Sequence, residues 1–181
     1  MEKFAFIIHP LSIHDMAHVS PVLKFIPDSW LESALKLKKP FQVSHITGIK
    51  SPYAEAEGWF IGCPLTSKQM VELPEEFVMD RIIESGKIAQ ELGAKVVGLG
   101  AFTSIVGDAG ITVAKNLDIA VTSGNSYTVA TALEGTREAV RLMGKDLATA
   151  HVTIVGASGS IGAACLSLIH ISEPTRLALI S

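Results

Sequence analysis

The sequence predicts an α/β fold, in which an N-terminal α/β domain is followed by the start of a second α/β domain. Short runs of β-branched and apolar residues alternate along the 181 residues with longer amphipathic segments of helical period. Near the end of the chain, one such run leads into a glycine-rich turn and then into small apolar residues typical of a helix. Both features are typical of parallel strands joined by helices.

The first third of the chain predicts three strands and two helical segments. Residues 4–10 form an apolar run that ends at a proline, as expected of a buried strand. A loosely helical stretch is expected at 19–26, and Asp28 is expected to cap a second short helix. Residues 42–49 alternate between apolar and polar side chains, which predicts a half-buried strand, and residues 59–64 predict another short strand.

The middle of the chain shows the clearest alternation of helices and strands. A helix is expected from Pro74 to Gly93, because a proline precedes its first turn, glutamates follow, and a glycine supplies the stop. Strands are expected at 94–100 and 117–121, and an amphipathic helix at 126–143. This order predicts an α/β unit.

A glycine-rich turn follows a strand predicted at Val152–Val155. Its spacing, Gly-x-x-Gly-x-x-Gly, is one residue longer in the first gap than the usual dinucleotide fingerprint and is similar to that of some NADP-preferring reductases. Gly156 would permit the sharp turn, Gly159 a close approach of phosphate, and Gly162 close packing of helix on strand. Free amides and the positive end of a helix favour an anion there. The alternative is a glycine turn without a ligand. The predicted cofactor-binding residues are Gly156, Ser158, Gly159, Ser160, Ile161 and Gly162.

Two loops at predicted strand ends carry hydroxyl and amide groups. Residues 101–107 follow the strand at 94–100, and residues 122–128 follow the strand at 117–121. Ligands of open α/β sheets collect at the carboxyl ends of strands, which favours a shared substrate cleft. The alternative is that these side chains only cap helices and hold turns. The predicted cleft residues are Thr103, Ser104, Thr122, Asn125 and Ser126.

Composition and charge argue against several kinds of partner. An apolar content of 48% with 18% charged residues is typical of a globular protein. A net charge of -3 is not the excess of positive charge expected of a protein that binds nucleic acid or an anionic membrane. The N-terminal apolar run is too short for a signal-peptide core or a membrane span. Cys63 and Cys165 lie far apart, so that neither a disulfide partner nor a zinc site is predicted. We therefore expect a cytoplasmic protein without a metal site.

Three blocks, at residues 99–105, 122–128 and 155–162, follow one another at the spacing of a known enzyme family. Together they resemble the long-chain acyl-[acyl-carrier-protein] reductases of cyanobacteria and the related bacterial predicted amino-acid dehydrogenases. The resemblance spans residues 4–166 and is loose in the N-terminal third. It implies an N-terminal substrate domain followed by a Rossmann domain that binds NADPH. It also implies reduction of a fatty acyl thioester to an aldehyde through a cysteine-bound acyl intermediate.

The chain departs from this family at the catalytic cysteine. The resemblance places that nucleophile well downstream of the glycine loop, in sequence absent here, so the catalytic residue is unknown. Cys63 falls in a short strand before Pro64, without a base or cationic neighbour in sequence. Cys165 falls in the opening turns of the last predicted helix, where a small buried thiol is expected. We therefore expect this chain by itself to be inactive and to hold cofactor poorly.

Residues 168–181 do not continue the pattern of a Rossmann domain. A ribose-contacting residue is expected about 20 positions after the glycines, but Pro174 interrupts the helix and residues 172–176 are similar to translated sequencing-adapter read-through. The alternative is a genuine short strand at Leu177–Ile180. The expected organisation is a substrate domain at 1–145, the first strand, loop and helix of a Rossmann domain at 146–167, and a non-native tail at 168–181.

The functional prediction is a piece of an NADPH-dependent oxidoreductase that reduces a fatty acyl thioester to an aldehyde. Its expected partner is an acyl carrier protein or a small-molecule substrate. Two alternatives stay open. One is an NAD(P) oxidoreductase resembling shikimate or amino-acid dehydrogenases, and the other is a nucleotide-binding module without turnover.

Overall fold

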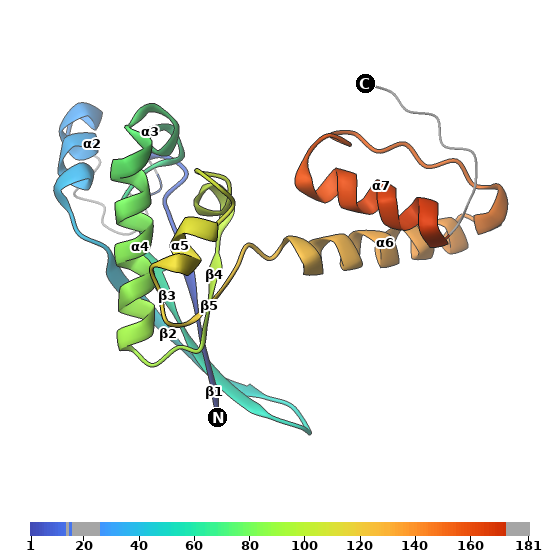
Figure 1. The fold of residues 1–181 in the computed structure, drawn as a ribbon, viewed down its shortest axis with the longest axis horizontal. Coiled ribbons are helices and arrows are strands. Elements are labelled where there is room, and N and C mark those ends of the chain that lie inside the picture. Colours follow the sequence, from blue (N-terminus) through green and yellow to red (C-terminus); the bar gives the residue numbers. More distant parts are fainter. Residues whose placement is uncertain (14, 16–25, 173–181) are drawn as a thin grey trace. The chain divides into compact units, whose positions relative to one another are not determined.

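The computed structural model describes residues 1–13, 15 and 26–172 (Figure 1). The chain divides into two compact units, Met1–Ser123 and Gly124–Ser181, and each unit is described by itself. Residues 19–25 of the predicted helical stretch and the alternative strand at Leu177–Ile180 lie outside the described residues. Of the helices that the structure describes, none combines the length and the hydrophobicity that a membrane span requires. The expected domain limits after residues 145 and 167 stay predictions.

The first unit is built on a five-stranded sheet with the strand order β2-β3-β1-β4-β5 (Figure 1). β1 pairs in parallel with β3 and β4, β4 pairs in parallel with β5, and β2 is antiparallel to β3. The predicted α/β fold class is therefore confirmed. The strands are β1 (Glu2–Ile8), β2 (Phe41–Lys50), β3 (Glu55–Gly62), β4 (Val96–Leu99) and β5 (Ala120–Thr122).

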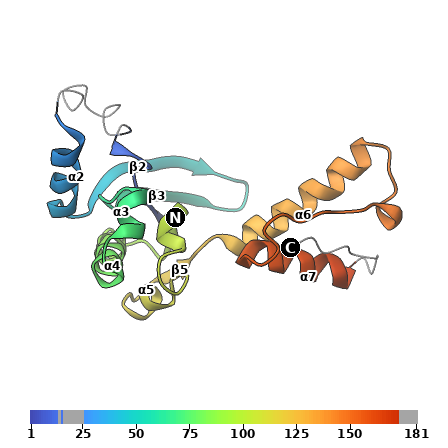
Figure 2. The same ribbon diagram turned by 90° about the horizontal axis from the view of Figure 1, so that it is seen from above.

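Helices connect the strands of this unit except β2 and β3, which a short turn joins, and α4 and α5 lie on the same side of the sheet (Figure 2). Pro74 precedes α4, and Gly93, with a φ of 85°, ends it, so that both predicted boundary signals are confirmed. α2 begins one residue earlier than expected, because Pro27 occupies the N-cap position and Asp28 is the first helical residue. The helical elements are α2 (Asp28–Leu37), α3 (Ser67–Glu72), α4 (Glu75–Glu91), the 3₁₀ turn η2 (Ala101–Ser104) and α5 (Ile111–Lys115).

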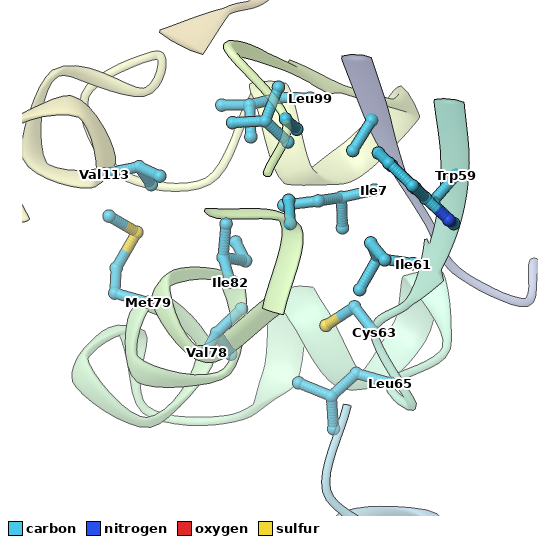
Figure 3. Close-up of a cluster of buried hydrophobic side chains, with 14 of the residues drawn as sticks. Ile7, Trp59, Ile61, Cys63, Leu65, Val78, Met79, Ile82, Leu99 and Val113 are labelled. Atoms are coloured by element: carbon cyan, nitrogen blue, oxygen red, sulfur yellow. The ribbon is translucent and has the colours of Figure 1, made fainter. Parts of the chain in front are cut away.

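The core of the first unit lies between α4 and the sheet. Val78 and Ile82, one turn apart on α4, are fully buried against the strands (Figure 3). Ile7, Ile61 and Val97 supply the facing side chains from β1, β3 and β4, and all three have no exposed surface. This apolar layer holds the carboxyl ends of the parallel strands in place.

The second unit contains α6 (Asn125–Leu142), the 3₁₀ turn η3 (Leu147–Thr149) and α7 (Ser160–Ser172). α6 and α7 pack against each other, with Val129, Val140 and Cys165 buried. The helix predicted at 126–143 is therefore confirmed, since α6 covers Asn125–Leu142.

The strand predicted at Val152–Val155 is wrong. Residues 152–154 form no regular structure, and Val155 lies in a turn with 95% of its side chain exposed. A β-branched run becomes a strand only when a neighbouring strand accepts its backbone hydrogen bonds. All the strands of the described residues lie between Glu2 and Thr122, in the first unit, so this run has no partner in its own unit.

Candidate functional site

The six residues predicted to bind a cofactor form an exposed turn and the first turn of α7. Residues 155–158 make the turn, which Gly159 closes by donating its amide to the carbonyl of Gly156 at 3.0 Å. α7 begins at Ser160, and its first backbone hydrogen bond runs from Ala163 N to Gly159 O at 2.8 Å. The amides of Ser160, Ile161 and Gly162 therefore belong to the donors that a helix leaves without an intrahelical acceptor.

The three glycines of this turn differ in whether their positions could accept a side chain. Gly156 has a φ of 77°, in the left-handed region that disfavours other residues. A Cβ at Gly162 would overlap the carbonyl group of Gly156, so only glycine lets α7 start this close to the turn. A Cβ at Gly159 would meet only the carbonyl oxygen of Gly156, at 3.4 Å, and would otherwise point into open space. The fold therefore requires Gly156 and Gly162, whereas Gly159 leaves the helix start uncovered.

Asn125 joins this turn to the start of α6. Its amide Nδ2 donates a hydrogen bond of 3.0 Å to Oγ of Ser160. A predicted cleft residue and a predicted cofactor residue are thus brought together within the second unit. Because Ser160 Oγ accepts this bond, its own hydroxyl hydrogen stays available to another acceptor. Ser126, the next residue of α6, is exposed.

The other predicted cleft residues belong to the first unit, at the carboxyl edge of the sheet. Thr103 is 1% exposed, and its hydroxyl donates to the carbonyl of Gly100 at 2.8 Å. Ser104 is half-buried and donates to the carbonyl of Ala101 at 2.7 Å. Both hydroxyls hold the η2 turn, as the alternative interpretation expects, and the substrate role of Thr103 and Ser104 stays a prediction. Thr122 ends β5 and is exposed.

The carboxyl edge has its topological switch point between β1 and β4. The chain leaves β1 toward β3 on one side, whereas β4 leads to β5 on the other, and ligands of doubly wound sheets bind at such a point. Here His9 Nε2 accepts a hydrogen bond of 3.2 Å from the amide of Phe102, and its Nδ1 lies 3.0 Å from the carbonyl of Pro10. The first contact leaves the proton on Nδ1, so the neutral ring serves as a brace between the two strand ends.

A cavity of about 290 Å³ lies beside this brace, at the carboxyl ends of β1 and β3. We call it the β1–β3 cavity. Cys63 N donates to the carbonyl of Ile8 at 2.8 Å, which holds the two strand ends together at its floor. α2 and the start of β2 supply the rest of the wall. The lining residues are Ile8, His9, Pro10, Asp15, Leu35, Lys38, Phe41, Val43, Gly62, Cys63 and Pro64.

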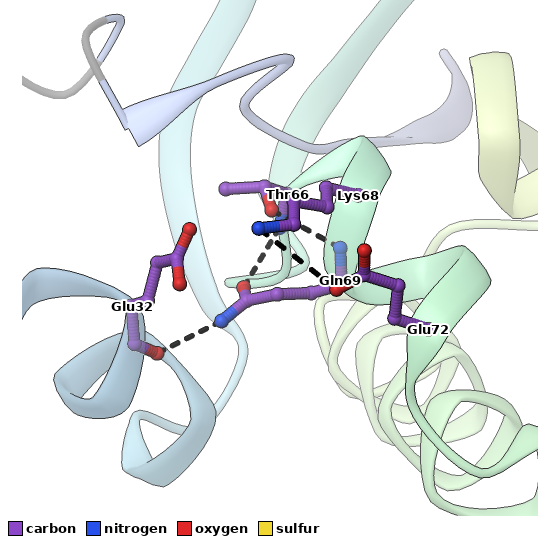
Figure 4. A network of polar contacts seen from close by, with 5 residues as sticks. All are labelled: Glu32, Thr66, Lys68, Gln69 and Glu72. Atoms are coloured by element: carbon purple, nitrogen blue, oxygen red, sulfur yellow. Dashed lines mark hydrogen bonds and ion pairs between the residues drawn. The ribbon is translucent and has the colours of Figure 1, made fainter. Parts of the chain in front are cut away.

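A buried polar network ties α2, and with it the cavity wall, to the start of α3 (Figure 4). Thr66 and Gln69 form a capping box, with hydrogen bonds of 3.1 and 3.2 Å, and are 2% and 4% exposed. Gln69 Nε2 also donates to the carbonyl of Glu32 on α2 at 2.8 Å. Since every polar atom of the Gln69 amide group is used, the network fixes α2 without leaving that group unsatisfied.

Neither cysteine has the surroundings of a nucleophile. Cys63 has no exposed surface, and burial raises the pKa of its thiol to about 12, against a smaller opposing effect of the hydrogen bond with Ser85. At neutral pH it is therefore a thiol and not the reactive thiolate. Cys165 is 8% exposed inside the packed face of α7.

The β1–β3 cavity is the feature that sequence patterns did not predict. Its lining comes from four separate stretches, residues 8–15, 35–38, 41–43 and 62–64. One signal was present: both β1 and β3 are followed within two residues by a proline, at His9-Pro10 and Cys63-Pro64. Such pairs mark strand ends, but only the parallel pairing of β1 with β3 brings the two together.

Comparison with known proteins shows that the chain is similar in sequence to part of a larger protein. No family model matches the chain. The chain is 29% identical over 178 residues to the protein named Aminotransferase PigE from Serratia sp. (strain ATCC 39006), in a match that covers 92% of this chain and 20% of that protein. The chain thus spans about a fifth of the length of this curated relative.

Proposed function

We propose that this chain supplies the substrate domain and the nucleotide-binding turn of an NADPH-dependent oxidoreductase that reduces a fatty acyl thioester to an aldehyde. The observation that carries the proposal is the turn at residues 156–162, where helix amides, an open glycine and an oriented hydroxyl meet. The three sequence blocks that resemble acyl-[acyl-carrier-protein] reductases support the same conclusion.

The residues of the turn fit the pyrophosphate of a dinucleotide. The helix start offers backbone donors and a positive partial charge to an anion. A side chain at Gly159, the residue before α7, would occupy open space, and glycine leaves that space free. Ser160 adds a hydroxyl whose oxygen is already held by Asn125. Among the described residues of the second unit, no strand precedes the turn, and a dinucleotide fold has a strand at that place.

In the proposed reaction the acyl carbon gains a hydride, the carbon–sulfur bond breaks, and the thiol leaves with a proton. NADPH, when bound, supplies that hydride. This chain's residues would bind and orient the cofactor. The amides at the start of α7 would hold its phosphates, and the hydrogen bond from Asn125 would hold the Ser160 side chain at that helix start. Because Cys63 is a buried neutral thiol, the acyl-accepting cysteine of the proposed mechanism is a residue other than Cys63.

The relative is compatible with this proposal. The relative is about five times as long as the segment that matches this chain. Because domains usually have about 50–250 residues, we expect it to contain several domains. Its name therefore need not describe the domain that matches this chain. Amino-group transfer requires a carbonyl compound as acceptor, and the aldehyde product of the proposed reduction is such a compound. A reductase segment beside an aminotransferase is therefore chemically coherent.

The proposal is tested by titrating the 181-residue chain with NADPH and following the nicotinamide fluorescence. Because this chain by itself is expected to hold the cofactor poorly, we expect weak but saturable binding. Gly159→Val should weaken it further by about tenfold to a hundredfold, since one hydrogen bond to a charged group contributes about 1.5–3 kcal/mol. The matched control is Gly135→Val on α6, where an added Cβ meets nothing within 4 Å. Equal affinity of the Gly159→Val variant and the wild type would exclude the turn as the nucleotide site.

A further inference from the structure

The β1–β3 cavity is lined mainly by apolar side chains and lies in the first unit. Ile8 comes from the end of β1, Leu35 from α2, Phe41 and Val43 from β2, and Pro64 follows β3. Leu35 is buried, whereas Val43 is 48% exposed. No residue of the predicted cofactor site or substrate cleft lines it.

The polar side chains of the lining offer few free hydrogen-bonding groups to a ligand. Both ring nitrogens of His9 have backbone partners, and Oδ2 of Asp15 accepts a hydrogen bond of 2.8 Å from the amide of Ser12. The Lys38 ammonium lies 3.9 Å from the centre of the Phe41 ring, in a cation–π contact. Lys38 and Asp15 carry opposite charges, so the lining has no net charge. A sugar or a nucleotide would exchange its hydration for few hydrogen bonds here, whereas a hydrocarbon has no hydrogen bonds with water to lose.

We propose that the β1–β3 cavity binds an unbranched aliphatic chain. An engineered cavity of about 150 Å³ holds benzene, so the present cavity of about 290 Å³ has room for a chain of roughly 8–12 carbon atoms. This inference rests on the proposed function for the identity of the chain, which would be the acyl part of the thioester substrate. The inference adds to the proposed function that the acyl chain is bound in the β1–β3 cavity.

The test is isothermal titration calorimetry of the 181-residue chain, without nucleotide, against saturated fatty acids of increasing length. We expect affinity to rise about fourfold with each methylene group, which is the worth of one buried CH₂, and to level off once the cavity is full at roughly 8–12 carbons. Because NADPH is absent, failure of nucleotide binding leaves this result intact, and failure of chain binding leaves the nucleotide site untouched.

Two substitutions on the same strand show whether the ligand occupies this cavity. Val43→Phe enlarges a lining side chain, and we expect it to weaken decanoate binding at least about tenfold by filling space. Ile49→Phe is the matched control, because Ile49 is also a β-branched residue of β2, is 45% exposed and lies outside the lining. Circular-dichroism melting curves verify that both variants are folded.

A second series separates a free fatty acid from a thioester. The neutral N-acetylcysteamine thioester of decanoic acid is titrated beside decanoate, with the wild type and with Lys38→Met. Equal binding of both ligands assigns the site to the chain alone, and tighter binding of decanoate that Lys38→Met abolishes places a carboxylate beside Lys38. No saturable binding of either ligand, no effect of Val43→Phe, or an equal loss in Ile49→Phe would overturn the proposal.

Discussion

The side chain of Asn125 donates a hydrogen bond of 3.0 Å from Nδ2 to Oγ of Ser160, and so links the first residue of α6 to the first residue of α7. The two residues are 35 positions apart in sequence. The contact brings the starts of two long helices together, and the positive ends of both are then available to one anion.

Replacing Asn125 by Ala is expected to weaken both the helix pair and the proposed phosphate site. Loss of one exposed hydrogen bond should lower the free energy of unfolding by about 0.5–1.5 kcal/mol. Ser160 also loses its oriented partner, so NADPH affinity should fall by several-fold. Urea denaturation and fluorescence titration measure the two effects. Ser126→Ala is the control at the neighbouring exposed position, and an equal change in both variants would show that the Asn125 contact has no special role.

The glycines of the turn are expected to differ in what they contribute. Alanine is favoured over glycine within a helix by about 1 kcal/mol, but at Gly162 its Cβ would overlap the backbone of Gly156, which costs about 1–3 kcal/mol. Gly162→Ala should therefore lower the melting temperature. Gly159→Ala should leave it nearly unchanged, because the added Cβ makes one ordinary contact at 3.4 Å. A lower melting temperature for Gly159→Ala than for Gly162→Ala would contradict the structure of the turn.

The stability of the first unit should fall in alkaline solution because of Cys63. Burial raises the pKa of this thiol from 9.0 to about 12 in the folded chain. Above pH 9 the unfolded chain loses the thiol proton while the folded chain keeps it, so rising pH favours unfolding. The free energy of unfolding should drop by about 1.4 kcal/mol between pH 8 and pH 10 from this group alone.

Urea denaturation of a Cys63→Ala variant measures that contribution by difference. The variant should lack this part of the alkaline loss, whereas Cys165→Ala, which leaves Cys63 in place, should retain it. The same alkaline loss in Cys63→Ala and the wild type would show that the thiol ionises normally in the folded chain.

The capping-box network should stabilise the wall of the β1–β3 cavity. Gln69→Leu removes the bonds to Thr66 and Glu32 and leaves a buried amide without its acceptor, which costs about 1–3 kcal/mol. The exposed pair of Lys68 and Glu72, 4.0 Å apart on the same helix, serves as the comparison (Figure 4). Lys68→Met should change stability by no more than about 0.5 kcal/mol. Chemical denaturation measures both, and equal losses would indicate that the network is not buried in solution.

Sequence patterns predicted the elements whose signals are local. α4 and α6 follow from apolar periodicity, and for α4 also from the boundary residues Pro74 and Gly93, the latter with positive φ. β3 and β4 follow from short apolar runs. The error at Val152–Val155 has the opposite cause: whether a β-branched run becomes a strand depends on a neighbour that the run itself does not encode.

The candidate site likewise combines features that local sequence patterns predict with contacts that they do not predict. The spacing of the glycines predicted the sharp turn at Gly156, because a turn before a helix is a local structure. Gly162 was expected to pack the helix on a strand, and instead it lets α7 start against the carbonyl of Gly156. The burial of Thr103 and the β1–β3 cavity depend on contacts among distant segments, which no pattern in one segment predicts. The pairing of Asn125 with Ser160 belongs to this second group, although each residue was singled out by itself.

The most direct test of the central claim is a two-dimensional amide NMR titration of the ¹⁵N-labelled chain with NADP⁺. If the turn before α7 binds the dinucleotide phosphates, the largest and saturable shifts should occur at the amides of residues 157–162 and at the Asn125 side-chain amide. Shifts confined to other residues, or none at all at millimolar NADP⁺, would contradict the account.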